Sequence, residues 1–239
     1  MERQESLGLH PSFILHRSPY SNSSLLLECF TANQGRFPLI ARGAAAAGKN
    51  GTMLQPFTPL VISWAGRGEV KTLRNHDVDG KPYNLKGNAL YCGFYINELL
   101  MRLVHRNDSN PAIFDLYRET LASLSTNDDL EGILRGFELA MLTQLGYGLN
   151  LEHDAESGEP VDSNGYYRYE IEVGPVRSAS RGGEQRISGK TLIALAKGGE
   201  MDKDGRREAK HLLRRIISFY IGDRPLKSRE LFRTLSSNN

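Results

Sequence analysis

Residues 12–42 have the sequence SFILHRSPYSNSSLLLECFTANQGRFPLIAR, and this stretch decides the fold of the N-terminal part of the chain. Its apolar runs are short and are separated by turn-forming residues such as Ser18-Pro19 and Asn33-Gln34-Gly35. Two similar runs follow, on either side of Gly66-Arg67-Gly68. Five short strands with tight turns in about 70 residues favour a small closed barrel of the OB type over a sandwich. The expected strands are 12–17, 24–31, 36–42, 60–64 and 69–75.

From residue 90 onward the apolar residues follow a helical period. Pro111 is typical of a helix start, and Asp128 or Asp129 can cap the helix that Gly146-Tyr147-Gly148 ends. The sequence therefore predicts an α+β protein with an N-terminal five-stranded OB-fold β-barrel at 1–80 and a C-terminal helical domain at 81–239. The expected helices are 90–104, 112–124, 130–147, 189–196, 205–220 and 228–235, and an acidic, turn-rich insertion at 150–183 is expected to include hairpin strands at 166–173.

The composition excludes several classes of protein. Of the 239 residues, 39% are hydrophobic and 24% are charged, as in soluble globular proteins. No stretch of 18 apolar residues occurs, and the charged N-terminus has no apolar core, so we expect neither a membrane span nor a secretory signal but a cytoplasmic protein. Two cysteines, Cys29 and Cys92, are too few for a disulfide framework or a four-cysteine zinc site.

The formal net charge of +2 conceals an uneven distribution of charge. Residues 1–76 carry a net charge of +4, residues 77–202 carry −8 and residues 203–239 carry +6. A basic face attracts polyanions even where acidic residues elsewhere cancel its charge. The two basic segments are therefore either binding faces for a polyanion or ordinary solvated surfaces.

Basic residues gather on the barrel and on one predicted helix. OB barrels bind single strands on aromatic side chains beside a basic groove, and Phe13, Phe30, Phe37, Phe57 and Trp64 are interleaved among the cations of the barrel. The alternative is that these rings fill the barrel interior. We also expect the loop at 43–52, which contains Lys49, to be mobile. The candidate DNA-binding residues are Arg17, Arg36, Arg42, Lys49, Arg67, Lys71 and Arg74 in the barrel and Arg207, Lys210, Arg214 and Arg215, with His211 beside them, on the helix at 205–220.

The helix at 130–147 carries an arginine outside its main apolar stripe. Arg135, Leu139 and Leu142 fall together on the side opposite the stripe. A guanidinium flanked by apolar side chains can receive an acidic peptide with an apolar tip. The alternative is that this helix is buried on two sides.

The sequence contains no complete catalytic motif. Residues 187–191 imitate a phosphate-binding loop, but Glu184 stands where that motif requires glycine. The six histidines have no partner residues that would make a nucleophilic triad. We therefore expect no catalytic residue, no cofactor and no bound metal. A solvated acidic loop is the favoured interpretation of the oxygen-rich cluster His153, Asp154, Glu156, Glu159 and Asp162.

Eight blocks of sequence, in order along almost the whole chain, resemble the bacterial recombination mediator family RecO. The similarity is strongest to its enterobacterial-type members. Many members carry a four-cysteine zinc site after the Leu-Gly-Tyr block, but this chain has His153 and no cysteine in that region, so zinc is not expected. The blocks are FILH at 13–16, SSL at 23–25, QPFTPL at 55–60, GRGEVKTLR at 66–74, YINELL at 95–100, RGFELA at 135–140, LGYG at 145–148 and PLKSRELF at 225–232.

The resemblance implies a DNA repair and recombination protein of the RecF pathway and not an enzyme. Such proteins bind single- and double-stranded DNA, anneal complementary strands and assist RecA loading onto DNA covered by single-stranded DNA-binding protein. The resemblance also implies two protein partners, RecR and the acidic C-terminal tail of single-stranded DNA-binding protein, with Arg135 as the arginine that receives the tail. Two alternatives remain open: an adaptor that binds only proteins, and a metal-dependent nuclease that uses the acidic loop.

Overall fold

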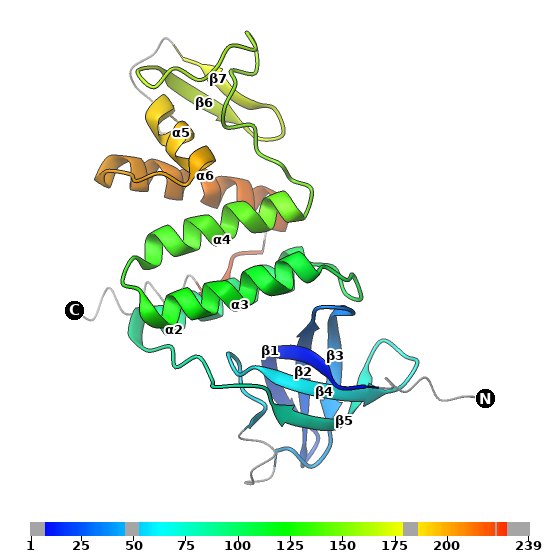
Figure 1. Ribbon diagram of the computed structural model, residues 1–239. Coiled ribbons are helices and arrows are strands. Elements are labelled where there is room, and N and C mark those ends of the chain that lie inside the picture. Colours follow the sequence, from blue (N-terminus) through cyan, green and yellow to red (C-terminus); the bar gives the residue numbers. More distant parts are fainter. Residues whose placement is uncertain (1–7, 46–52, 179–185, 223, 229–239) are drawn as a thin grey trace. The chain divides into compact units, whose positions relative to one another are not determined.

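The computed structural model describes residues 8–45, 53–178, 186–222 and 224–228. The chain divides into two compact units, and Figure 1 shows their elements. One unit comprises Met1–Asp128 and Leu226–Asn239, and the other comprises Asp129–Pro225.

The first unit contains the expected five-stranded closed barrel, with strands in the order β1-β2-β3-β5-β4. The barrel closes through the antiparallel pairing of β1 with β4, and the pairing of β3 with β5 is parallel. The OB-like barrel that the apolar runs predict is therefore confirmed. Its strands are β1 (His10–Tyr20), β2 (Ser24–Thr31), β3 (Gly35–Ala41), β4 (Leu60–Ala65) and β5 (Lys71–Val78).

Alternation along β2 shows how the barrel is filled. Leu25, Leu27 and Cys29 lie in the barrel core, while Phe30, with the opposite parity, contacts the Phe114 ring at 5.5 Å outside the barrel. Because both faces of β2 are covered, its apolar residues form a nearly continuous run, unlike those of a strand with one solvated face. Burial also raises the pKa of the Cys29 thiol, which keeps it neutral.

The five aromatic residues that the sequence places among basic residues are all buried. Phe37 and Trp64 contact each other inside the barrel, with ring centroids 4.8 Å apart. Phe57 packs on Phe94 at 5.3 Å, while Phe13 and Phe30 pack against rings of the following helices. Packing thus accounts for these rings, two in the barrel core and three outside it. The exposed fractions are 2% for Phe13, 0% for Phe30, 1% for Phe37, 5% for Phe57 and 8% for Trp64.

Two helices, α2 (Gly87–Leu103) and α3 (Pro111–Thr126), belong to the same unit as the barrel. Helix α3 begins at Pro111, as expected, and the Asn110 side chain caps it by accepting a hydrogen bond from the Ile113 amide at 3.0 Å. A buried chain of hydrogen bonds joins these helices to β1: the Tyr117 hydroxyl donates to Asn97 Oδ1 at 2.7 Å, and Asn97 Nδ2 donates to the Leu15 carbonyl at 2.8 Å.

The second unit contains three helices and a small sheet with strand order β7-β6-β8. Strand β8 was not expected from the sequence, because three residues are too few to show a period. Side chains of Asp129, Ser188 and Asp202 cap the three helices. The elements are α4 (Leu130–Gln144), β6 (Tyr166–Glu170), β7 (Gly174–Arg177), β8 (Arg186–Ser188), α5 (Gly189–Lys197) and α6 (Lys203–Ile221).

Most helix boundaries differ from the sequence prediction by one to three residues, and two of the differences have a clear local cause. Helix α4 ends at Gln144, before the predicted residue 147, because Gly146 adopts a positive φ of 84° and the Tyr147 amide bonds back to the Leu142 carbonyl. Helix α6 begins earlier than predicted, because Asp202 caps it. Two further expectations lie mainly outside the described residues: the helix at 228–235 and the loop at 43–52.

Candidate nucleic-acid interface

Arg36 lies in an internal ion-pair cluster of the first unit. Its Nη1 pairs with Glu28, and its Nε and Nη2 both donate to the Val104 carbonyl, at 3.1 and 2.9 Å. The same carboxylate of Glu28 pairs with Arg106 at 2.9 Å. Only 12% of the Arg36 side chain is exposed, and every guanidinium nitrogen has a partner. The structure therefore places Arg36 where it joins β3 to the segment after α2.

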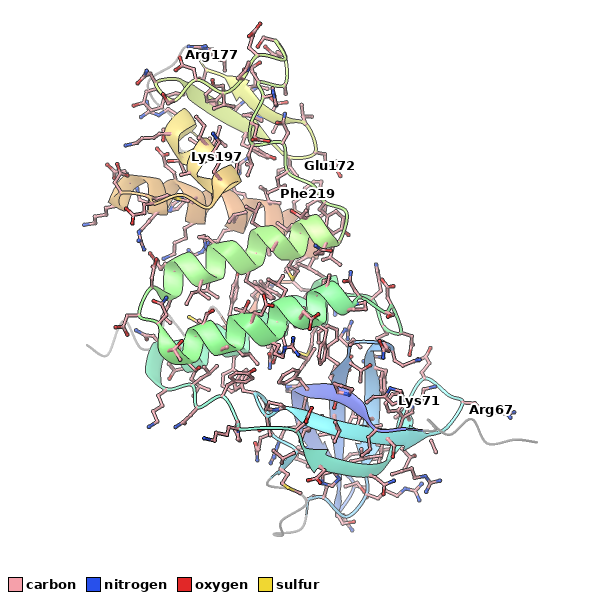
Figure 2. All side chains as sticks on the ribbon, in the orientation of Figure 1. Arg67, Lys71, Glu172, Arg177, Lys197 and Phe219 are labelled. Carbon is pink, nitrogen blue, oxygen red and sulfur yellow. The ribbon has the colours of Figure 1, made fainter. Side chains whose placement is uncertain are left out.

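The other cations predicted on the barrel differ in exposure. Arg17 is half-buried and donates to the Leu54 carbonyl at 3.4 Å, while Lys49 lies outside the described residues. The remaining four cluster in sequence around the end of β3 and the β4–β5 hairpin, and Figure 2 shows Arg67 and Lys71 at that hairpin. Among the described residues, no ion pair involves Arg42, Lys71 or Arg74.

A β-bulge sets the position of Arg74. Ser63 pairs with Asn75 but Trp64 pairs with Leu73, so Arg74 is the extra residue on β5. A bulge turns its side chain away from the regular alternation of the strand. Arg74 is exposed, whereas Leu73 packs against the barrel core. The bulge thus places the exposed Arg74 on β5, a strand whose inward-facing residues pack against the barrel core.

A basic depression of about 520 Å³ lies along α6 in the second unit. It contains three of the four cations predicted on this helix, and it adds Lys203 and Arg206. Lys203 precedes the predicted helix start at 205, and extending the helix back to its Asp202 cap would have found it. Arg206 lies within the predicted helix but was not included in its basic face. The depression is lined by Glu131, Lys203, Arg206, Arg207, Lys210, His211 and Arg214.

Acidic residues at the start of α4 neutralise part of this depression. Lys210 pairs with Glu131, and Arg206 pairs with Asp129. The hydrogen bond from Lys210 holds the pKa of Glu131 below its ordinary value of 4.5. These exposed pairs contribute little to stability, and a phosphate can compete for their cations. The fourth predicted cation, Arg215, is half-buried and donates to the Tyr169 carbonyl at 3.2 Å.

Arg135 and its two predicted neighbours lie on α4, but they do not form an exposed surface. Leu142 is fully buried, Leu139 is half-buried, and the Arg135 side chain is 12% exposed. Arg135 Nη2 donates to Glu138 Oε1 at 2.7 Å, and its buried Nε and Nη1 have no hydrogen-bond partner among the described residues. Because Leu134, Phe137 and Met141 are buried too, α4 is covered on two sides.

The acidic cluster at 153–162 is organised as a turn. Asp154 is buried, and its Oδ1 accepts hydrogen bonds from the amides of Glu156 and Ser157 at 3.0 and 2.8 Å. Its Oδ2 accepts one from the Arg177 amide at 2.7 Å. Although burial opposes ionisation, these bonds together lower the pKa of Asp154. No group of three metal-ligating side chains was found in the part of the chain that the structure describes.

The stretch that imitates a phosphate loop has a carboxylate at the corresponding helix end. Glu208 Oε2 accepts hydrogen bonds from the Ser188 amide at 2.9 Å and from the hydroxyls of Ser188 and Thr191 at 2.7 Å. A helix N-terminus favours a negative group, and here the side chain of α6 provides it. An external phosphate is therefore not needed at the start of α5.

The fold and these surfaces define a protein with an OB-like barrel, a helical region and exposed basic faces suited to a polyanion. Residues 10–79 match the family model described as "Recombination protein O N terminal", and residues 85–230 match "Recombination protein O C terminal". The chain belongs to this family, RecO. Membership implies a role in DNA repair and recombination.

Proteins named "DNA repair protein RecO" are similar over nearly the whole chain. The one from Nitrosospira multiformis is 41% identical over 239 residues, which cover 97% of this chain and 96% of the relative. The one from Methylococcus capsulatus is 45% identical over 230 residues, with 95% and 94% covered. The one from Coxiella burnetii is 42% identical over 226 residues, with 94% and 97% covered. Among the described helices, none is long and apolar enough to cross a membrane.

Proposed function

We propose that this protein is a DNA-binding recombination mediator that binds single- and double-stranded DNA and anneals complementary strands. The observation that carries this proposal is the basic depression along α6, whose lining includes five Lys or Arg side chains and one carboxylate. Two polyanionic strands approach each other only when cations screen them, and phosphate neutralisation releases counterions. Annealing makes and breaks no covalent bond, so the proposed function needs no catalytic residue.

Four barrel cations, three of them exposed and Lys71 half-buried, form the second proposed DNA contact. Arg42, Arg67, Lys71 and Arg74 present charge from the end of β3, the β4–β5 hairpin and the bulge in β5. Their neighbours in the predicted set contribute less, because Arg36 is held in the Glu28 cluster and Arg17 donates to the Leu54 carbonyl. Phosphate contacts of this kind give affinity without sequence preference, which suits a protein that anneals any pair of complementary strands.

We further propose that Arg135 receives the acidic C-terminal tail of single-stranded DNA-binding protein. The buried Nε and Nη1 of Arg135 have no hydrogen-bond partner among the described residues, which costs free energy. A carboxylate of the tail would remove this cost by accepting hydrogen bonds from them. Half-buried Leu139 would contact the apolar tip, while Leu142 supports the helix from behind. Holding the tail would raise the local concentration of the protein on covered DNA and so assist RecA loading. RecR completes the set of proposed partners, and the cytoplasmic nucleoid is the proposed location.

The affinity for single-stranded oligonucleotides, measured against salt concentration, tests the DNA proposal. The wild-type affinity should fall steeply with salt. Replacing Arg207, Lys210 and Arg214 together with Ala should reduce the slope of log affinity against log salt by about two units. Replacing Arg42, Lys71 and Arg74 tests the barrel in the same way, and Lys86→Ala with Arg118→Ala provides a control with exposed cations elsewhere.

Each competing class predicts a different result. An affinity for strands that does not depend on salt, or no binding at low salt, would contradict the proposal and favour a protein-only adaptor. Cleavage of DNA in magnesium or manganese would favour the nuclease alternative. The buried, fully hydrogen-bonded Asp154 argues against that alternative.

A further inference from the structure

Phe219 is the most exposed aromatic side chain in the described part of the second unit, with 54% of its surface accessible. It lies in the last turn of α6, and Figure 2 shows it at that end of the helix. Its ring is nearly perpendicular to that of Tyr220, with ring centroids 5.2 Å apart. Tyr220 in turn stacks on Tyr147, with centroids 4.0 Å apart and an interplanar angle of 23°. Phe219 is thus an exposed ring supported by a packed aromatic pair.

The same helix places cations on a ridge that leads to this ring. Arg207, His211, Arg215 and Phe219 are each four residues apart, so they form one row along the surface of α6. Arg207 and His211 line the basic depression, and the bond from Arg215 to the Tyr169 carbonyl fixes the next guanidinium in the row. The aromatic ring therefore ends a row of basic side chains.

An exposed ring beside cations also distinguishes unpaired from paired nucleic acid. A base can stack on an aromatic side chain only when its own flat face is free, and such stacking tolerates any base. In the barrel, the five aromatic residues interleaved with cations are buried and cannot serve this purpose. We infer that Phe219 is a stacking platform for a base of single-stranded DNA whose phosphates lie along the Arg207, His211 and Arg215 row.

This inference rests on the proposed DNA binding and assigns single-strand recognition to one end of α6. The test compares Phe219→Ala with the wild type, using a fluorescent single-stranded oligonucleotide and a blunt duplex of equal length. Single-strand affinity should fall about tenfold, and duplex affinity should stay within twofold. Phe219→Leu should behave like Phe219→Ala because it keeps an apolar group but no ring. Phe219→Trp keeps an aromatic ring and should bind the single strand about as tightly as the wild type does.

The tryptophan variant provides a direct signal of stacking. The wild-type chain has one tryptophan, Trp64, which is buried in the barrel and gives the baseline. Added single strand should quench the additional emission of the Phe219→Trp protein and leave the wild-type emission nearly unchanged. Val173→Ala, which shortens another exposed apolar side chain of this unit, is the matched control and should bind both DNAs normally.

Several outcomes would overturn the inference. Unchanged single-strand affinity in Phe219→Ala would do so, as would equal losses for single strand and duplex. Full affinity in Phe219→Leu, or loss of acidic-peptide binding in place of oligonucleotide binding, would show that the patch is an apolar protein-docking surface. If the wild type fails to bind single strands at low salt, the proposed function itself fails, and that result is separate from a failure of Phe219 alone.

Discussion

The guanidinium of Arg36 and the carbonyl of Val104 are joined by two hydrogen bonds across 68 positions of sequence, at 3.1 and 2.9 Å. Val104 is the C-cap residue that directly follows α2, in a region where backbone oxygens lack helical partners. Glu28 holds the third nitrogen of the guanidinium and also pairs with Arg106. Arg36, which the sequence predicts to bind DNA, therefore joins the barrel of the first unit to its helices.

The first prediction is that Arg36→Ala acts mainly on stability. Removing the guanidinium leaves the nearly buried Glu28 with only the partly exposed Arg106, and the free energy of unfolding should fall by about 3 kcal/mol. Arg42→Ala, at an exposed position, should change it by less than about 0.5 kcal/mol. Urea denaturation measures both values. A larger loss of stability in Arg42→Ala than in Arg36→Ala would contradict this assignment.

The second prediction concerns Gly35, at the turn before β3. Its φ is +64°, and a Cβ added there would stand 1.9 Å from the Asp108 carbonyl oxygen. Gly43 has a similar φ of +69° but no atom within 4 Å of an added Cβ. Gly43→Ala should therefore cost only the backbone strain, about 1 kcal/mol, while Gly35→Ala should cost at least about 3 kcal/mol. Equal melting temperatures for the two variants would show that the segment at Asp108 moves aside.

The barrel and the basic face of α6 could be predicted because their signals are local. Short apolar runs bounded by turn residues identify the strands within a few residues, and a helical period separates the apolar side of α6 from its cations. Asp129 could be predicted as a cap for the same reason, since the hydrogen bond spans only three residues. Features of this kind can be predicted from neighbouring residues alone, without knowing which other elements pack against them.

Arg36 and Arg135 could not be placed in the same way. The partner of Arg36 is a backbone carbonyl, which every residue has and which leaves no mark in the sequence. The pairing of Arg135 with Glu138 follows a common helical spacing, but its burial depends on what covers α4. Phe219 is one of several apolar residues in the last two turns of α6, so only its exposure in the structure separates it from the core residues Ile216 and Ile217.

The third prediction separates the role of Arg135 in peptide binding from its role in stability. Arg135→Ala alone would leave the fully buried Glu138 without this ion pair and would destabilise the unit. The double variant Arg135→Ala with Glu138→Gln removes both charges, and it should bind an acidic peptide with an apolar tip at least about tenfold more weakly. Glu138→Gln alone leaves the guanidinium un-neutralised and should bind the peptide at least as tightly as the wild type.

Fluorescence anisotropy of a labelled tail peptide measures these affinities, and circular dichroism checks that each variant is folded. Arg118→Ala, at an exposed arginine of α3, is the control and should leave the peptide affinity unchanged. Equal affinities for the double variant and for Glu138→Gln would remove Arg135 from the peptide site.

The last prediction uses the carboxylate of Glu98, which receives the chain as it returns to the first unit. Its Oε2 accepts hydrogen bonds from the Ser228 amide at 2.8 Å and the Ser228 hydroxyl at 2.7 Å, and its Oε1 accepts one from the Lys227 amide at 3.0 Å. Burial opposes ionisation, but these bonds and the Arg102 charge together lower the pKa of Glu98 below its ordinary value of 4.5.

A lowered pKa in the folded state means that the ionised carboxylate stabilises the protein above pH 4.5, and that this contribution is lost as the pH falls through the folded-state value. Glu98→Gln should be less stable than the wild type at neutral pH, because an amide presents one acceptor oxygen to three donors. The difference in unfolding free energy between the two proteins should stay constant from pH 7 to about pH 5 and shrink below that. Urea titrations at a series of pH values measure this difference, and subtracting the variant cancels the other carboxylates whose pKa values are lowered. A difference that stays the same down to pH 3 would show that Glu98 acts through packing and not through its charge.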